Sequence, residues 1–207
     1  MNTLTARDSV FSDLHASALK PAGFRKKGHW ATRAKADTIQ AVYLRASRFG
    51  SSAEAIFWID IQVFHAGWYE LLFSPKVFTG PKEGIPSLLT EELGKMSEPS
   101  MHTLTIRSET SASVLTETLR KVLVEKALPV LEQCATLEGV LGYYIARKNP
   151  NMDALSAAGV CLLLGRDAEA RKYMDEAKSL AAHENDLRWL GLREKSMWAN
   201  RSETHVV

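Results

Sequence analysis

The sequence predicts an α+β protein: an antiparallel sheet of about four strands, helices on one face of it, and a C-terminal helical extension. Three patterns predict this class. Apolar residues recur at helical spacing over the first 20 positions, four later segments alternate as strands do, and helical spacing returns after Thr110. Strands grouped together rather than alternating with helices favour α+β over α/β.

The first helix is expected to end near Leu19. Its apolar stripe consists of Val10, Phe11, Leu14 and Ala18. Pro21 lacks the backbone donor that a helix interior needs, and Gly23 can adopt the left-handed conformation that closes a helix. The following residues, Arg25, Lys26 and Lys27, are predicted to form a basic turn into the first strand.

Four strands follow from the alternation of side chains. His29–Lys35 and Thr38–Arg48 are predicted to pair as a hairpin through Ala36 and Asp37, with Trp30 on the same strand face as Thr32 and Ala34. Ala53–His65 is the strongest strand, and Met101–Arg107 is the fourth. In the third strand Phe57, Ile59, Ile61 and Val63 share the face expected against helices, and Trp58, Asp60, Gln62 and Phe64 share the other.

Residues 67–100 are predicted to be largely irregular because prolines and glycines interrupt them, with one short helix at Ser87–Lys95. Loops of this length are typical of binding elements, so Trp68 and Tyr69 are predicted to contact a partner. After a cap at Thr110 or Ser111, helices are expected to Asn200, interrupted or restarted at Pro129.

The expected organisation is an α+β domain over residues 1–135, a helical extension packed on it over 136–200, and a flexible tail over 201–207. Residues 152–200 resemble a single tetratricopeptide-type helical hairpin, with small or apolar residues at Ala158, Cys161, Gly165, Ala170, Met174 and Ala177. The two cysteines, Cys134 and Cys161, lie on apolar helical stripes and are predicted to be buried thiols.

Composition limits the function classes. The chain has 207 residues, 45% of them hydrophobic, and a net charge of +2. No apolar run approaches the roughly 18 residues of a membrane-spanning helix, and the first ten residues carry no apolar signal region, so we expect a cytoplasmic protein with no membrane partner.

The order of these elements resembles a bacterial family catalogued as domain of unknown function 4304, over roughly residues 5–135. The residues that carry the resemblance are Leu19, Lys20, Pro21, Gly23, Phe24, Lys26, Lys27, Gly28, Ser47 and the triplet Ala127, Leu128 and Pro129. Arg45 stands where family members commonly have a glutamine. The resemblance implies the fold and a bacterial source, and related domains near toxin genes imply an immunity-type partner.

Catalytic and cofactor signatures are missing from the sequence. There is no nucleophile elbow, phosphate-binding glycine loop or dinucleotide fingerprint, and no two histidines have metal-ligand spacing on a helix. We therefore predict no cofactor, no metal and no catalytic residue. Asp60 is expected to pair with Arg45 or Arg107 across the sheet. The alternative is an uncharacterised enzyme with a site near Asp60, His65 and His102.

The segment from Lys20 to Arg48 is strongly basic, with eight bases and one acid. It predicts a non-catalytic module that binds an acidic protein, such as a toxin that it neutralises, through a basic and aromatic surface. The residues assigned to that surface are Arg25, Lys26, Lys27, Arg33, Lys35, Arg45, Arg48, Trp68 and Tyr69. The alternative partner for the same bases is nucleic acid. Solvated basic turns are also common, and whether these bases share one surface is a geometric question.

Overall fold

The chain folds into two compact units. A computed structural model describes residues 2–49, 51, 53–147 and 150–204. The first unit comprises Met1–Lys35, Ile39–Val63 and Leu89–Glu132, and the second comprises Ala36–Thr38, Phe64–Leu88 and Gln133–Val207. Within the described part of the chain, no helix is both long enough and apolar enough to cross a membrane.

The N-terminal helix ends as the sequence predicts. Helix α1 (Thr3–Leu14) continues into a π-helical turn, η1 (His15–Leu19), whose last hydrogen bond runs from the Lys20 N–H to the His15 carbonyl. Gly23 then takes a φ of +88°, and the Phe24 N–H donates to the Leu19 carbonyl. The predicted stripe of Val10, Phe11, Leu14 and Ala18 is buried.

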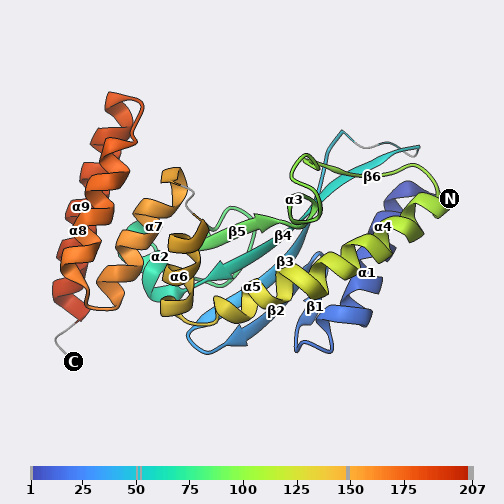
Figure 1. Cartoon of the computed structure of the whole chain (residues 1–207), viewed down its shortest axis with the longest axis horizontal. Helices are drawn as coiled ribbons and strands as arrows, with labels where there is room; N and C mark the ends of the chain where they lie inside the picture. Colours follow the sequence, from blue (N-terminus) through green and yellow to red (C-terminus); the bar gives the residue numbers. More distant parts are fainter. Residues whose placement is uncertain (1, 50, 52, 148–149, 205–207) are drawn as a thin grey trace. The chain divides into compact units, whose positions relative to one another are not determined.

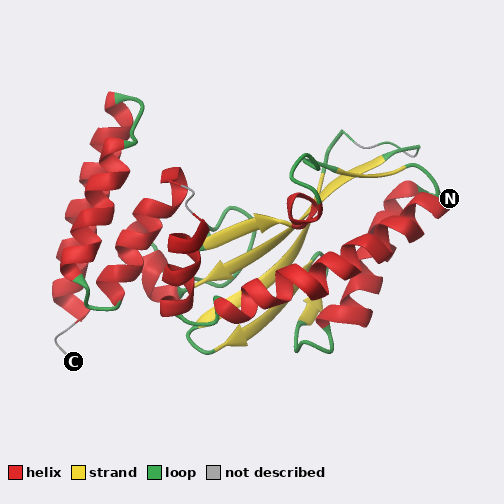
Figure 2. Ribbon diagram, viewed as in Figure 1, coloured by secondary structure: helices red, strands yellow, loops and turns green. Residues whose placement is uncertain are grey.

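The sheet of the first unit has six strands (Figures 1 and 2): β1 (Arg25–Lys27), β2 (Trp30–Lys35), β3 (Thr38–Ala46), β4 (Ala55–Phe64), β5 (Leu89–Glu92) and β6 (Leu104–Ile106). The order is β1-β2-β3-β4-β5, with β6 also on β4. The antiparallel sheet of an α+β protein is thus confirmed, with two strands more than expected.

Both additional strands correct a sequence prediction. Arg25–Lys27 is not a turn but an edge strand that pairs with β2, and the tight turn lies at Gly28, where φ is +59°. The predicted helix at Ser87–Lys95 is wrong, because residues 89–92 form β5 and helix α3 (Leu93–Ser97) begins only afterwards. Pairing with β4 satisfies the backbone groups of this segment and outweighs its local helical tendency.

Helices cover one face of this sheet. Figure 1 shows α4 (Glu109–Val122) running across it beside α1, and the turn η2 (Leu123–Ala127) and helix α5 (Leu128–Gln133) continue the same path. Ser108, two residues before the predicted cap, begins α4 in a capping box with Ser111. The covered face consists of buried apolar side chains, including Ala31, Val42, Leu44, Phe57, Ile59, Ile61 and Val63.

Five helices build the second unit: α2 (Ala66–Phe73), α6 (Leu137–Arg147), α7 (Pro150–Leu163), α8 (Asp167–Ser179) and α9 (Glu184–Thr204). Helices α7 and α8 form a hairpin that turns at Gly165, where φ is +74°. Ala158, Cys161, Ala170, Met174 and Ala177 are buried, as is Cys134, so both thiols lie inside as predicted. The tetratricopeptide likeness stays a prediction.

The predicted loop that would expose Trp68 and Tyr69 is wrong. Both residues lie on α2, and each side chain is only 4% exposed. The His65 side chain caps this helix by accepting a hydrogen bond from the Trp68 N–H at 3.1 Å. At the other end of the chain, α9 continues through Thr204, and residues 205–207 lie outside the described residues.

Candidate functional site

The candidate site is the sheet face opposite α1 and α4. Lys26 lies opposite Ala31 in the β1–β2 register, and its Nζ lies 5.8 Å from the centre of the Phe11 ring of α1. Because side chains alternate along a strand, Arg25 and Lys27 project from the other face. We call this side the open face and define it by Arg25, Lys27, Trp30, Tyr43, Arg45, Trp58, Asp60 and Glu92.

Two aromatic rings form the centre of the open face. Trp30 of β2 and Tyr43 of β3 stack with their ring centres 4.1 Å apart and their planes inclined by 14°. Each ring therefore gives one of its broad faces to the other. Both residues are only half-buried.

Arg45 connects the aromatic and acidic parts of the face. Its Nε donates to Asp60 Oδ2 at 3.1 Å, and its Nη2 lies 3.7 Å from Glu92 Oε1. The guanidinium carbon lies 4.5 Å from the centre of the Trp58 ring, within the range of a cation–π contact. Lys95 Nζ lies 3.1 Å from Glu92 Oε2. The two acids are therefore matched by two bases.

The predicted pairing of Asp60 with Arg45 is confirmed, whereas Arg107 pairs with Glu54 at 2.7 Å. Burial raises the pKa of Asp60 above its ordinary value, and the hydrogen bond from Arg45 opposes that rise. The second carboxylate oxygen, Oδ1, is buried and accepts no hydrogen bond from the described residues. Asp60 thus depends on Arg45 for its charge compensation.

The structure brings three of the nine predicted partner-binding residues together on this face: Arg25, Lys27 and Arg45. Lys26 lies over α1 instead. Arg33 is on the helix-covered side, where its Nη2 donates to Glu132 Oε1 at 2.7 Å, and Lys35 Nζ lies 3.0 Å from the other oxygen of Glu132. Arg48 is exposed beyond the end of β3.

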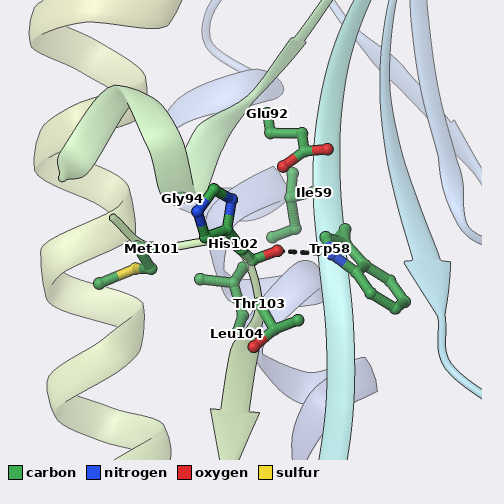
Figure 3. Close-up of a pocket in the computed structure, with 8 residues that line it drawn as sticks. All are labelled: Trp58, Ile59, Glu92, Gly94, Met101, His102, Thr103 and Leu104. Carbon is green, nitrogen blue, oxygen red and sulfur yellow. Dashed lines mark hydrogen bonds between the residues drawn. The ribbon is translucent and has the colours of Figure 1, made fainter. Parts of the chain in front are cut away.

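The residues of the alternative enzyme site make separate contacts. His65 caps α2, and burial lowers its pKa. His102 uses its backbone carbonyl to accept a hydrogen bond from Trp58 Nε1 at 2.7 Å, at the rim of a shallow hollow between β4 and residues 101–104 (Figure 3). Among the described residues, no three His, Cys, Asp or Glu side chains are grouped to hold a metal ion.

Comparison with protein-family models assigns the chain to a family. The model of a domain of unknown function, DUF4304, matches residues 15–133, more than half of the sequence. The chain belongs to the DUF4304 family. The match covers β1 to β6 and the helical path from α4 to α5, but not α1, and it includes every residue of the open face. Searches of curated proteins and of solved structures found no match.

Sequence reasoning missed the aromatic centre of this DUF4304 surface. The alternation of side chains places Trp30 on the correct strand face but does not show that Tyr43 and Trp58 share that surface. The sequence signal for this surface is the alternation of side chains along each strand. Trp58 alternates with the buried apolar residues of β4, and Trp30 and Tyr43 lie on the same side of the neighbouring β2–β3 hairpin. Aromatic side chains opposite a fully apolar strand face indicate a second, partly exposed surface.

Proposed function

We propose that this DUF4304 protein is a non-catalytic binding module that docks a partner protein on the open face. One observation carries the proposal: Trp30, Tyr43, Trp58 and Arg45 gather on the face that the helices of the first unit leave uncovered. Trp, Tyr and Arg are the residues that most often anchor protein interfaces. A binder needs only such a surface, whereas an enzyme needs converging reactive groups.

The ring geometry favours a protein partner over single-stranded nucleic acid. Bases stack on the free broad faces of aromatic rings. In the open face Trp30 and Tyr43 each give one ring face to the other, and Arg45 lies over Trp58. Three ring faces that a nucleobase could use are therefore already covered. Arg33 and Lys35 are also paired with Glu132, so fewer basic side chains are available to contact phosphates.

The finer proposal is an immunity-type role in the cytoplasm, in which docking on the open face neutralises a toxin encoded beside this protein. The test co-expresses the chain with the product of the neighbouring gene. Rescue of growth together with co-purification is expected for the wild type and is expected to be lost in the Trp30→Ala/Tyr43→Ala variant. Trp189→Ala, which removes a 42% exposed tryptophan of the second unit, is the matched control. Absence of both rescue and co-purification for the folded wild type would refute the role.

Nucleic acid is the second candidate, because Arg25, Lys26 and Lys27 are three consecutive exposed bases on an edge strand. Phosphate contacts predict that binding to a generic RNA or DNA oligonucleotide weakens steeply as salt rises. Changing all three residues to alanine is then expected to reduce the slope of log K against log salt concentration by about three, one unit for each lost phosphate contact. A fluorescence-anisotropy titration at several salt concentrations distinguishes this candidate, since no binding even at low salt excludes it.

A further inference from the structure

The charged side chains of the open face that form no ion pair with the described residues lie at the margin formed by β1. At the other margin, Asp60 and Glu92 are matched by Arg45 and Lys95. Arg25 and Lys27 are exposed and make no ion pair with any of the residues that the structure describes. The aromatic strip of Trp30, Tyr43 and Trp58 lies between the two margins. A partner therefore meets excess positive charge beside exposed rings.

The edge of β1 is poorly suited to the addition of a partner strand. The Phe24 N–H donates to the Leu19 carbonyl at 3.0 Å, and the Phe24 carbonyl lies 3.2 Å from His15 Nε2. Lys27 and Trp30 flank the two-residue turn and form a hydrogen-bonded pair, so their backbone groups point toward each other. The next pair along the hairpin does not exchange hydrogen bonds, so Lys26 is the residue of β1 whose backbone groups point toward the free edge. One residue is too little for strand addition, so the partner element has to lie across the face.

The width of the aromatic strip favours a helix as that element. Sheet-on-sheet packing requires apolar side chains across both inner faces. Here the rings occupy a strip bordered by Arg25 and Lys27 on one side and by Asp60 and Glu92 on the other. An amphipathic helix has an apolar stripe of limited width with polar residues on both sides, which matches this pattern.

Resting on the proposed function, we infer that the open face binds an acidic amphipathic helix of the partner protein. Arg25 and Lys27 lie two residues apart on β1, which corresponds to about 7 Å between their backbones. Two acidic residues four positions apart on a helix are separated by about 6 Å on the same side. Such a helix brings both carboxylates to the β1 margin, with its apolar stripe over Trp30 and Tyr43.

The test uses three designed helical peptides with the same apolar stripe and with Glu, Gln or Lys at the flanking positions. Each is titrated into the ¹⁵N-labelled full-length chain, and an RNA oligonucleotide is titrated in parallel. The Glu peptide is expected to shift the amide signals of residues 25–27, 30, 43, 45 and 58. Its affinity is expected to fall about tenfold in Arg25→Glu/Lys27→Glu and at raised salt. Lys121→Glu/Lys172→Glu changes the same net charge at exposed positions outside the face and is expected to retain binding.

The outcomes separate this inference from the proposed function. Equal binding of the Glu and Gln peptides on the open face would overturn the acidic preference and leave a protein-binding surface. Preferential binding of the Lys peptide would reverse the inferred partner charge. Shifts caused only by the RNA would overturn both the inference and the proposed function. No shift by any peptide would overturn the helix inference, while co-purification with the neighbouring gene product would still decide the proposed function.

Discussion

Arg33 joins three parts of the first unit. Its guanidinium donates to the Ala22 carbonyl at 2.6 Å, to Gln40 Oε1 at 2.8 Å and to Glu132 Oε1 at 2.7 Å, and it lies 4.5 Å from the centre of the Phe24 ring. The side chain is only 7% exposed. It therefore holds the turn after α1, the β2–β3 hairpin and α5 in one arrangement, which is a structural role and not partner binding.

Replacing Arg33 with methionine is expected to lower the free energy of unfolding by about 3 kcal/mol, because buried acceptors such as Gln40 Oε1 lose their donor. Lys35→Met removes a partner of the same Glu132 from a half-exposed position and is expected to cost less than about 1 kcal/mol. Urea denaturation of both variants measures the difference. An equal loss of unfolding free energy in the two variants would contradict the proposal that Arg33 holds these three parts together.

The contributions of Asp60 and Glu132 to the free energy of unfolding are expected to change with pH in opposite directions. Burial raises the folded-state pKa of Asp60 above 3.8, so the folded state binds this proton more tightly and stability is lost as pH rises through that pKa. Hydrogen bonds from Lys35, and then Arg33, lower the pKa of Glu132 below 4.5, so its contribution is present above 4.5 and is lost as pH falls. Relative to the wild type, Asp60→Asn should become more stable as pH rises above 3.8, whereas Glu132→Gln should become less stable as pH rises toward 4.5. Urea denaturation across these pH values measures both slopes, and parallel curves would contradict the assignment.

At the scale of elements, two π-helical turns precede prolines. Turn η1 ends two residues before Pro21, and η2 ends two residues before Pro129. Proline lacks the N–H of a helical hydrogen bond and crowds the preceding turn, and the wider i→i+5 pattern gives the backbone room to adapt. The two motifs that carry the family resemblance, around Pro21 and Pro129, therefore share one structural device.

Gly159 and Gly142 are both inside helices but differ in their surroundings. A Cβ at Gly159 of α7 would lie 2.8 Å from Leu72 Cδ1 and 3.0 Å from Trp68 Cδ1, whereas one at Gly142 of α6 would meet nothing closer than Gln133 Nε2 at 4.0 Å. Gly159→Ala is expected to destabilise by about 2 kcal/mol through overpacking. Gly142→Ala is expected to stabilise by about 0.5–1 kcal/mol through helix propensity. Thermal unfolding distinguishes them, and a neutral Gly159→Ala would contradict the tight contact between α2 and α7.

Elements with a clear period were predictable from sequence, and those decided by tertiary contacts were not. The alternation in β4 predicted both of its faces, and the Ala36–Asp37 connection predicted the β2–β3 hairpin. Strand β5 owes its conformation to pairing with β4. Helix α2 is short and mostly apolar, with Glu70 as its one charged residue, so its sequence shows little helical periodicity. The open face required knowledge of which strands are neighbours, because Trp30, Tyr43 and Trp58 are separated in sequence.

At the scale of the whole molecule, the two units are interleaved along the chain. Residues 64–88, from the last residue of β4 to the start of β5, belong to the second unit together with the C-terminal helices. Helix α2 contacts α7 and α9 there, and Asn200 Nδ2 lies 3.4 Å from the Leu71 carbonyl. A cut near residue 135 therefore separates Trp68 and its neighbours on α2 from the helices that bury them.

Two shortened chains test this organisation. The chain 2–135 is expected to bind a hydrophobic dye and to aggregate, because Trp68, Tyr69 and Leu72 lose their cover from α7 and α9. In the second chain, residues 64–88 are also replaced by Asn-Gly. Val63 and Leu89 face each other in the β4–β5 register, so a two-residue hairpin turn can join them. This chain is expected to be monomeric and to unfold cooperatively by circular dichroism and ultracentrifugation, since it retains the sheet with α1 and α4. A folded first chain and an unfolded second chain would show that residues 64–88 stabilise the first unit instead of belonging to the second.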